Sequence, residues 1–314
     1  MTGTLESDAL APERPRFHGV VSDLAALRKA SRARRYGNGV FPPELPSRSV
    51  IAKLLTDLAA ILYPRHFGPP EEQLHAPEHY LARQLDRLFL AIREQIRREV
   101  KLFVADASEE AVDRRATEIA EEFVQGLPRV RALLDADVNA AYLGDPAAKS
   151  IDEVIFCYPG VLALINHRLA HRLYRLGAPM IARIISEIAH SQTGIDIHPG
   201  ATIDEGFFID HGTGVVIGET TIIGKNVRLY QAVTLGAKRF SVDENGALEK
   251  GKPRHPIIED EVVIYAGATV LGRITIGRGS SIGGNVWLTH SVPPGSNITQ
   301  AKAHVEFFDH GAGI

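Results

Sequence analysis

Hydrophobic residues in the first 190 positions recur at intervals of three and four, the spacing of amphipathic helices. Five segments carry this pattern: 50–62, 81–92, 109–123, 161–176 and 180–189. Proline and glycine separate them, at Pro64, Pro128, Gly144 and Gly177 among other places,. We therefore expect residues 1–190 to form an α-helical domain, of which the polar, proline-bearing stretch 1–15 is a disordered lead,.

After Ser191 the helical spacing gives way to an interval of six residues. One unbroken register comprises Ile197, Ile203, Ile209, Val215, Thr221, Val227 and Val233, and a second comprises Ile258, Ile264, Val270, Ile276, Ile282 and Leu288. A six-residue repeat is typical of a parallel β-helix, in which three hexapeptides make one triangular coil. Residues eighteen apart should then stack, so that Ile197, Val215 and Val233 form one inward column.

The repeat sets the remaining boundaries of an α+β chain. We expect the β-helix over 191–292 and a C-terminal tail over 293–314. Between the two registers, residues 237–256 are too polar and glycine-rich to form a coil, and we interpret them as a loop excursion from the prism,. Long loops on regular scaffolds often carry function.

Composition narrows the choice of partners and compartment. The net charge is −3, from 35 basic and 38 acidic side chains, so there is no electrostatic case for nucleic acid or an anionic membrane,. No apolar stretch is long enough to span a bilayer, and no signal pattern opens the chain,. The single cysteine, Cys157, suits the cytoplasm, and its apolar surroundings at 154–158 predict a buried wall rather than a nucleophile,.

The motif at 209–214 offers a candidate general base. Ile209 points inward, so Asp210 should point outward at a corner, next to His211 and two glycines that permit close approach of a ligand,. Asp196, fifteen residues earlier, should come within reach across adjacent coils. A carboxylate behind an imidazole fixes its tautomer and raises its basicity, as proton abstraction from a hydroxyl requires. The alternative is that His211 is a polar corner residue.

The sequence gives less support to a metal site or a phosphate-binding loop. Zinc sites between prisms need paired histidines on consecutive coils, a spacing that is absent here,. His167 and His171 are four apart but lack the glutamate of a metalloprotease motif, and the glycines of 272–284 are interpreted as repeat turns rather than as a phosphate cradle,. We expect no metal and no permanently bound cofactor.

Several motifs resemble those of the serine acetyltransferases, a family of hexapeptide-repeat acyltransferases. These are residues 195–201, 209–214, 218–220, 233–236 and 254–256, with 144–147 and the helix 158–177 upstream. The resemblance covers about Asp145 to Pro294. It implies a left-handed winding of the β-helix, which the spacing alone does not show.

The resemblance also implies an activity: transfer of acetyl from acetyl-CoA to L-serine, giving O-acetyl-L-serine and CoA, the first step of cysteine biosynthesis from serine. His211 would take the hydroxyl proton while Asp196 holds its imidazole, and backbone N–H groups would stabilise the oxyanion. The ammonium of serine would be bound by Asp145 and Asp210. Its carboxylate would be bound by Arg254 and His255, a pairing that suits a guanidinium.

Acetyl-CoA would lie in a groove between neighbouring prisms. The residues implied along its path are Gly236, Ala237, Ala266, Gly267, Ser281 and Gly284. Each site would need two subunits, so the resemblance implies a homotrimer, which the helical domain would pair into a hexamer. It further implies feedback inhibition by cysteine at the serine site, and insertion of a tail ending in Ile314 into O-acetylserine sulfhydrylase,.

The sequence departs from the family pattern in four places. Ala237 replaces a second glycine, Ser281 replaces a frequent lysine, the 237–254 excursion is longer than usual, and 296–303 lacks the usual A-G-x-P-A step. Two alternatives stay open at this point. One is a hexapeptide acyltransferase acting on another amino acid or a sugar; the other is an inactive β-helix that regulates the sulfhydrylase.

Overall fold

The computed structural model describes residues 16–37, 42–70, 77–104, 107–239, 244, 246 and 248–300. The chain divides into two compact units, 1–44 and 45–314. In the first unit, helix α1 (His18–Tyr36) has no buried residue. The predicted disordered lead at 1–15 lies outside the described residues.

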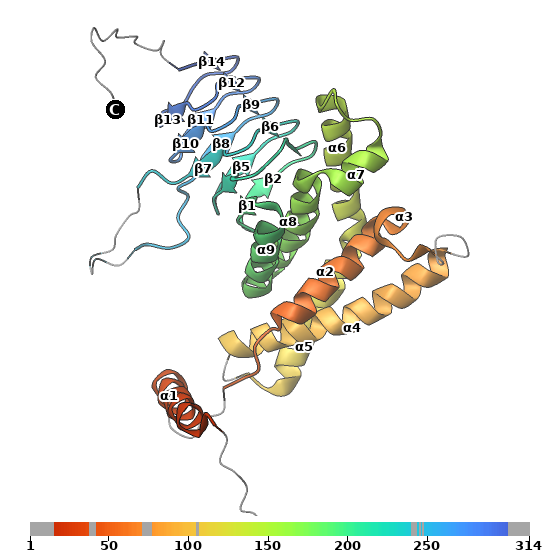
Figure 1. Cartoon of the computed structure of the whole chain (residues 1–314), viewed down its shortest axis with the longest axis vertical. Helices are drawn as coiled ribbons and strands as arrows, with labels where there is room; N and C mark the ends of the chain where they lie inside the picture. Colours follow the sequence, from red (N-terminus) through yellow and green to blue (C-terminus); the bar gives the residue numbers. More distant parts are fainter. Residues whose placement is uncertain are drawn as a thin grey trace, which may run out of the picture. The chain divides into compact units, whose positions relative to one another are not determined.

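The second unit begins with an α-helical region. Its helices are α2 (Arg48–Leu62), α3 (Pro64–Phe67), α4 (Pro77–Phe103), α5 (Glu109–Gln125), α6 (Leu127–Gly144), α7 (Ile151–Cys157), α8 (Pro159–Leu176) and α9 (Pro179–Thr193) (Figure 1). The five segments with helical periodicity are therefore confirmed as helices α2, α4, α5, α8 and α9.

Helix α6 was not predicted, and one sequence interpretation in this region is wrong. Pro128 does mark a helix boundary: α5 ends at Gln125, and Pro128 lies in the first turn of α6, where its missing N–H is not needed,. Cys157 does not belong to a buried wall, because it ends the short helix α7 and is exposed, as is Phe156. Only Val154 and Ile155 of that run are buried.

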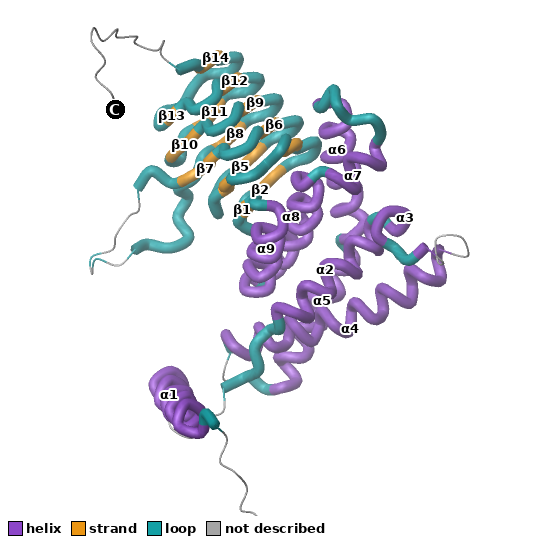
Figure 2. Tube along the Cα trace, in the orientation of Figure 1, coloured by secondary structure: helices purple, strands orange, loops and turns teal. Residues whose placement is uncertain are grey.

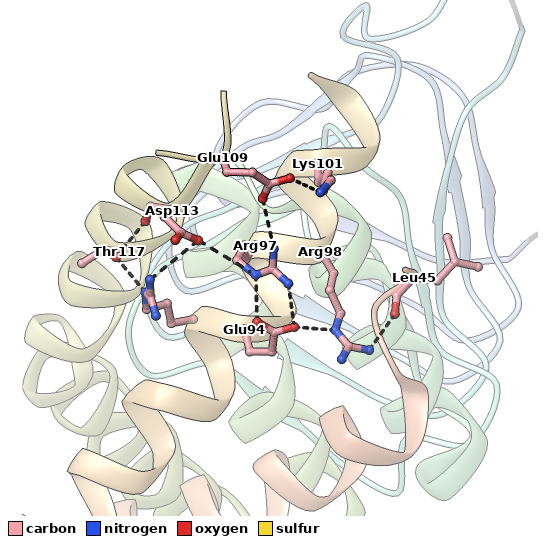
Figure 3. Close-up of polar contacts among 9 residues, drawn as sticks. Leu45, Glu94, Arg97, Arg98, Lys101, Glu109, Asp113 and Thr117 are labelled. Atoms are coloured by element: carbon pink, nitrogen blue, oxygen red, sulfur yellow. Dashed lines mark hydrogen bonds and ion pairs between the residues drawn. The ribbon is translucent and has the colours of Figure 1, made fainter. Parts of the chain in front are cut away.

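Charged side chains join α4 to α5 on the surface of the helical region (Figure 3). The Arg97 guanidinium lies 2.9 Å from Glu94 and 4.0 Å from Asp113, and Lys101 pairs with Glu109. Such partly exposed pairs contribute little each. The buried apolar residues of the two helices, such as Ile96 on α4 and Phe123 on α5, contribute more,.

The β-helix follows as three parallel sheets, one for each side of the prism (Figure 2). The first sheet contains β1 (Asp196–Ile197), β4 (Val216–Ile217), β7 (Thr234–Gly236), β10 (Thr269–Leu271) and β13 (Trp287–Leu288). The second contains β2 (Thr202–Ile203), β5 (Ile222–Ile223), β8 (Ile257–Ile258) and β11 (Thr275–Ile276). The third contains β3 (Phe208–Ile209), β6 (Arg228–Leu229), β9 (Val263–Ile264), β12 (Ser281–Ile282) and β14 (Asn297–Ile298).

The predicted inward column is wrong at its first step. Ile197 pairs with Ile217, twenty residues on, and not with Val215. From Ile217 the expected interval of eighteen holds, since its partner is Leu235. The difference arises because the turn after β3 contains two residues more than a hexapeptide supplies. That turn, Asp210–Gly214, contains the candidate base.

Two corners of the prism are built from residues with positive φ, stacked coil upon coil. One column comprises Gly206, Asn226, Glu261, Gly279 and Gly295, and the other comprises Gly194, Gly214, Ala232, Gly267 and Asn285. Among the described non-glycine residues with positive φ, only His211 (φ 57°) belongs to neither column. Its backbone conformation is therefore not imposed by the repeat.

The excursion and the end of the β-helix were predicted with different success. β8 pairs with β5 and β7 pairs with β4, so the chain leaves the prism after β7 and re-enters it at Ile257 without disturbing the sheets. The predicted end at residue 292 is too early, because β14 pairs with β12 and extends the β-helix to Ile298. Residues 301–314, including Ile314, lie outside the described residues.

A buried ion pair joins the helices to the first coil. Arg168 of α8 contacts Asp137 of α6 at 2.6 Å and donates to the carbonyl oxygens of Ile203 and Asp204 at 2.9 and 2.8 Å. Asp137 in turn accepts the N–H of Phe207 at 2.9 Å. Because both buried charges are hydrogen-bonded, the pair fixes α6 and α8 against the segment that joins β2 to β3,. Asp145 follows α6 and His211 follows β3, so both sides of this contact lead to candidate site residues.

Candidate active site

The first group of candidate residues lies at the corner Asp210–Gly214, which we call the His211 corner. The N–H of Asp210 donates to the Leu229 carbonyl at 2.8 Å, which completes the strand ladder. The next hydrogen bond, from the Gly212 N–H to the Asp210 carbonyl at 2.7 Å, closes a tight turn around His211. A positive φ is unfavourable for a residue with a Cβ, and such strain is frequent at functional sites,.

The His211 side chain is exposed, and its charged neighbour is Asp210. Nε2 of His211 lies 4.0 Å from Oδ1 of Asp210, with side-chain exposures of 71% and 17%. Asp196 begins the outward-facing row of the first sheet, and its N–H donates to Val215 just beyond the corner. Among the described residues, the Asp196 carboxylate forms no hydrogen bond or ion pair. The structure thus brings the two residues to adjacent coils, and a role for Asp196 at the imidazole stays a prediction.

The helical region supplies Asp145 to the same corner. Asp145 follows α6 and accepts two hydrogen bonds, from the Tyr158 hydroxyl to Oδ2 and from the Ala147 N–H to Oδ1 at 2.8 Å. These hydrogen bonds lower the pKa of the Asp145 carboxyl, with smaller electrostatic contributions from the nearby His211 and Arg228 side chains. The carboxylate is therefore ionised beside the candidate base.

Glycines let the helices approach this corner. A Cβ on Gly160, in the first turn of α8, would lie 2.4 Å from the Ile209 carbonyl oxygen, and one on Gly144 would lie 2.1 Å from Arg228 Nη2. Neither position tolerates a side chain without a shift. The ends of α6 and α8 therefore lie directly on the strand that leads into the corner.

The second group lies where β4 ends, at Gly218–Thr221, against Arg254 and His255; we call it the His255 corner. Arg254 Nη2 lies 2.6 Å from Glu219 Oε2, and the other oxygen of that carboxylate accepts the Tyr174 hydroxyl at 3.1 Å. Thr220 Oγ1 accepts the backbone N–H of Arg254 at 2.9 Å. The loop excursion thus rejoins the β-helix through the contacts of Arg254 with Glu219 and Thr220.

Hydrogen bonds fix the tautomer of His255. The Thr220 N–H donates to His255 Nδ1 at 3.1 Å, so Nδ1 must be unprotonated and the hydrogen of the neutral ring resides on Nε2,. Burial, helped by the charge of Arg254, lowers the pKa of His255 to about 4. A Cβ on Gly218 would lie 2.0 Å from His255 Cδ2. The result is a rigid, neutral N–H donor next to a guanidinium.

The two corners lie at opposite ends of β4, so one chain does not bring all the predicted site residues together. The residues implied for acetyl-CoA divide in the same way. Gly236 ends β7 and Ala237 follows it, at the end of the strands where the His255 corner lies. Gly267 belongs to the column above the His211 corner, and Ala266 and Gly284 lie next to that column, where the Ala266 carbonyl accepts the Asn285 N–H at 2.9 Å. Ser281 begins β12 on the third sheet.

Sequence reasoning missed the residues that support these side chains. Glu219 and Thr220 stood within a matching motif, but no role followed from it. Tyr158 gave no signal beyond its place before a helix.

Within the described ranges, no three His, Cys, Asp or Glu side chains gather to hold a metal ion. None of the helices searched there has the length and apolar character to cross a membrane.

Comparisons with known proteins agree on one family. The bacterial transferase hexapeptide family (six repeats) matches residues 255–290. A plasmid serine acetyltransferase of Synechococcus elongatus is 58% identical over 275 residues, 86% of each chain. The serine acetyltransferase of Bacillus licheniformis is 51% identical over 173 residues, which cover 55% of this chain and 76% of that one.

Solved structures match over most of the chain. Serine acetyltransferase 1 of Entamoeba histolytica in complex with L-cysteine has a TM-score of 0.70 at 35% identity, covering 90% of this chain and 97% of that one. Soybean serine acetyltransferase complexed with serine has a TM-score of 0.51 at 29% identity, covering 79% and 95%.

These matches confirm the expected architecture, an α-helical region followed by a left-handed parallel β-helix. Together with the identity to the Synechococcus protein over most of both chains, they show that this chain belongs to the serine acetyltransferase family.

Proposed function

We propose that this chain transfers the acetyl group of acetyl-CoA to the hydroxyl of L-serine through a site made from both corners. Family membership supports the reaction, and the chemistry of the corners supports the acceptor. Asp145 and Asp210 offer negative charge to an ammonium, while Arg254 and the Nε2–H of His255 offer donors to a carboxylate. Only a zwitterion such as an amino acid uses both sets, and the soybean relative is complexed with serine.

His211 is the proposed base. Its exposed imidazole takes the hydroxyl proton as the serine oxygen attacks the thioester carbonyl carbon,. The tetrahedral intermediate collapses by breaking the C–S bond, and the same imidazole returns the proton to the sulfur of CoA. Asp196, on the adjacent coil, is proposed to stabilise the charged imidazole during the transfer.

We propose that two subunits complete each site. The His211 corner of one chain would face the His255 corner of its neighbour, and closure of this head-to-tail contact gives a trimer. Acetyl-CoA would occupy the groove between them, along Gly236, Ala237, Ala266, Gly267, Ser281 and Gly284. The helical region is proposed to pair trimers into a hexamer.

Regulation follows from the same chemistry. Cysteine has the ammonium and carboxylate of serine, and the Entamoeba relative binds L-cysteine, so we propose feedback inhibition at the serine site. The tail ending in Ile314 is proposed to bind O-acetylserine sulfhydrylase through its terminal carboxylate. A single cysteine suits the reducing cytoplasm, where we place the reaction,.

One assay of CoA thiol release tests the proposal. L-serine should support turnover, whereas glycerol, glucosamine and β-alanine should not, and His211→Ala should reduce turnover by about 10³-fold with the circular dichroism spectrum unchanged. Preference for an amine or sugar would favour the broader acyltransferase alternative. Absence of turnover with every acceptor would favour the inactive, regulatory alternative.

A further inference from the structure

We propose that Tyr158 is a positioning residue for the amino-acid substrate: its hydroxyl holds the Asp145 carboxylate in the orientation that receives the serine ammonium. This inference rests on the proposed function and adds a residue to which the family resemblance assigned no role. It also gives the helical region a direct part in substrate recognition.

Two hydrogen bonds orient the Asp145 carboxylate. A carboxylate has about four acceptor positions, two on each oxygen. The Ala147 N–H takes one on Oδ1, and the Tyr158 hydroxyl takes one on Oδ2. Each oxygen is thereby fixed and keeps one free acceptor position. An ammonium group with three N–H donors can use these positions, and Asp210 can serve a further one.

The packing of α8 on the β-helix fixes the position of Tyr158. It is the residue before α8, two positions from Gly160, whose missing Cβ allows contact with the Ile209 carbonyl. Burial, the hydrogen bond to Asp145 and the negative charges of Asp145, Glu153 and Asp210 raise the pKa of the Tyr158 hydroxyl. Tyr158 is therefore a neutral donor at working pH, held next to Asp145 by the packing of α8 on β3.

A competing cation shows why the carboxylate needs holding. Arg228 also attracts Asp145, and its guanidinium lies 5.1 Å from the Phe208 ring against Gly144. Without the Tyr158 hydroxyl, Oδ2 is free to rotate toward this guanidinium. An ion pair between Asp145 and Arg228 would occupy the acceptor positions that the ammonium needs.

Steady-state kinetics of the assembled enzyme test this inference. Tyr158→Phe should raise KM for L-serine about 10-fold, the size expected from loss of a hydrogen bond to a charged group. The kcat and the KM for acetyl-CoA should stay within about twofold. The matched control is Tyr63→Phe, which removes a Tyr–Asp hydrogen bond of 3.2 Å to Asp135 elsewhere in the helical region and should change neither KM.

Two further measurements separate positioning from a general structural effect. Because Tyr158 acts through Asp145, the double variant Asp145→Asn/Tyr158→Phe should have the KM for L-serine of Asp145→Asn alone. Loss of the hydroxyl also removes the hydrogen bond that lowers the pKa of Asp145, so the pKa of this carboxyl, followed by NMR titration, should rise in Tyr158→Phe.

The outcomes distinguish the role of Tyr158 from the assignment of Asp145 to the serine ammonium. An Asp145→Asn effect with no Tyr158→Phe effect, or strictly additive effects, would overturn the role of Tyr158 and leave the proposed function intact. If Asp145→Asn itself left KM for L-serine unchanged, the assignment of Asp145 to the ammonium would fail and Tyr158 with it.

Discussion

His211 and His255 lie at opposite ends of β4 and are held in opposite ways. The His211 side chain is 71% exposed on a turn with positive φ, and its nearest charged group lies 4.0 Å away. His255 is 7% exposed, and its Nδ1 is bound to Thr220. This difference supports the roles proposed for the two side chains. A base that transfers a proton must be reachable and able to change charge, whereas a donor that binds the substrate must keep one charge state and one orientation.

The two corners also differ in what holds the backbone. At the His211 corner, a two-residue insertion moves the chain off the repeat and strains it. At the His255 corner, Thr220 Oγ1 accepts the backbone N–H groups of Arg254 and His255 and so fixes the chain where it returns from the loop excursion. Neither device is part of the hexapeptide repeat. The residues proposed for the site therefore lie where the chain departs from the repeat.

The largest expected effect comes from separating the corners onto different chains. His211→Ala and Arg254→Ala should each reduce kcat/KM for L-serine by about 10²-fold or more. When the two inactive variants are co-expressed, about a quarter of the corner pairs in random trimers contain both intact residues. Thiol release should then recover to about that fraction of wild type.

Activity of separately expressed variants, mixed without exchange of subunits, provides the control and should stay at the mutant level. If co-expression also restored nothing, the corners would not meet between chains, and the shared-site proposal would have to be abandoned.

A second experiment compares the two carboxylates near His211. If Asp196 supports the imidazole, Asp196→Asn should lower kcat about 10²-fold. If Asp210 binds the ammonium, Asp210→Asn should mainly raise KM for L-serine. The reverse pattern would identify Asp210, 4.0 Å from Nε2 in this structure, as the partner of the imidazole. Stopped-time thiol assays over a range of serine concentrations separate kcat from KM.

A smaller effect is expected from disturbing His255 through its backbone neighbour. Gly218→Ala places a Cβ 2.0 Å from the ring and must displace it, so KM for L-serine should rise about 10-fold,. Gly19→Ala is a suitable control, because nothing lies within 4 Å of its Cβ. An unchanged KM in Gly218→Ala would show that the His255 ring is not a substrate donor.

The smallest effect concerns pH and stability. Burial lowers the pKa values of His198 and His255 to about 4, against an ordinary 6.5. Between these values the unfolded chain binds more protons, so the free energy of unfolding should fall as pH drops from 6.5 to 4. The urea midpoint should be lower at pH 5 than at pH 7, and less so in His198→Asn/His255→Asn. An equal pH dependence in that variant would contradict the assignment.

The sequence was sufficient for the architecture because both halves of the second unit are periodic. Helical spacing identified α2, α4, α5, α8 and α9, and the six-residue interval identified the prism. It did not predict α6, because Pro128 was interpreted only as a boundary and not as the start of a further helix. It also failed at Cys157, because a short apolar run does not reveal which of its side chains face solvent.

The contacts around the candidate site were predictable only in part, for a related reason. His211 and Arg254–His255 stand in motifs, so the resemblance predicted roles for them, and these roles stay predictions. The pairing of Ile197 with Ile217 was missed because the two-residue insertion lengthens the interval between partners from eighteen to twenty residues, while the buried Val215 keeps the six-residue pattern apparently unbroken. Tyr158 and Thr220 were missed because their roles depend on contacts between segments far apart in the chain.

The backbone of His211 has a consequence for anyone who engineers this protein. Holding a side chain with a Cβ at a φ of 57° costs about 1 kcal/mol, which glycine would avoid,. Variants selected for heat resistance alone are therefore expected to lose this imidazole early. A library at the turn should be scored for turnover and melting temperature together, since the two quantities favour different residues at position 211.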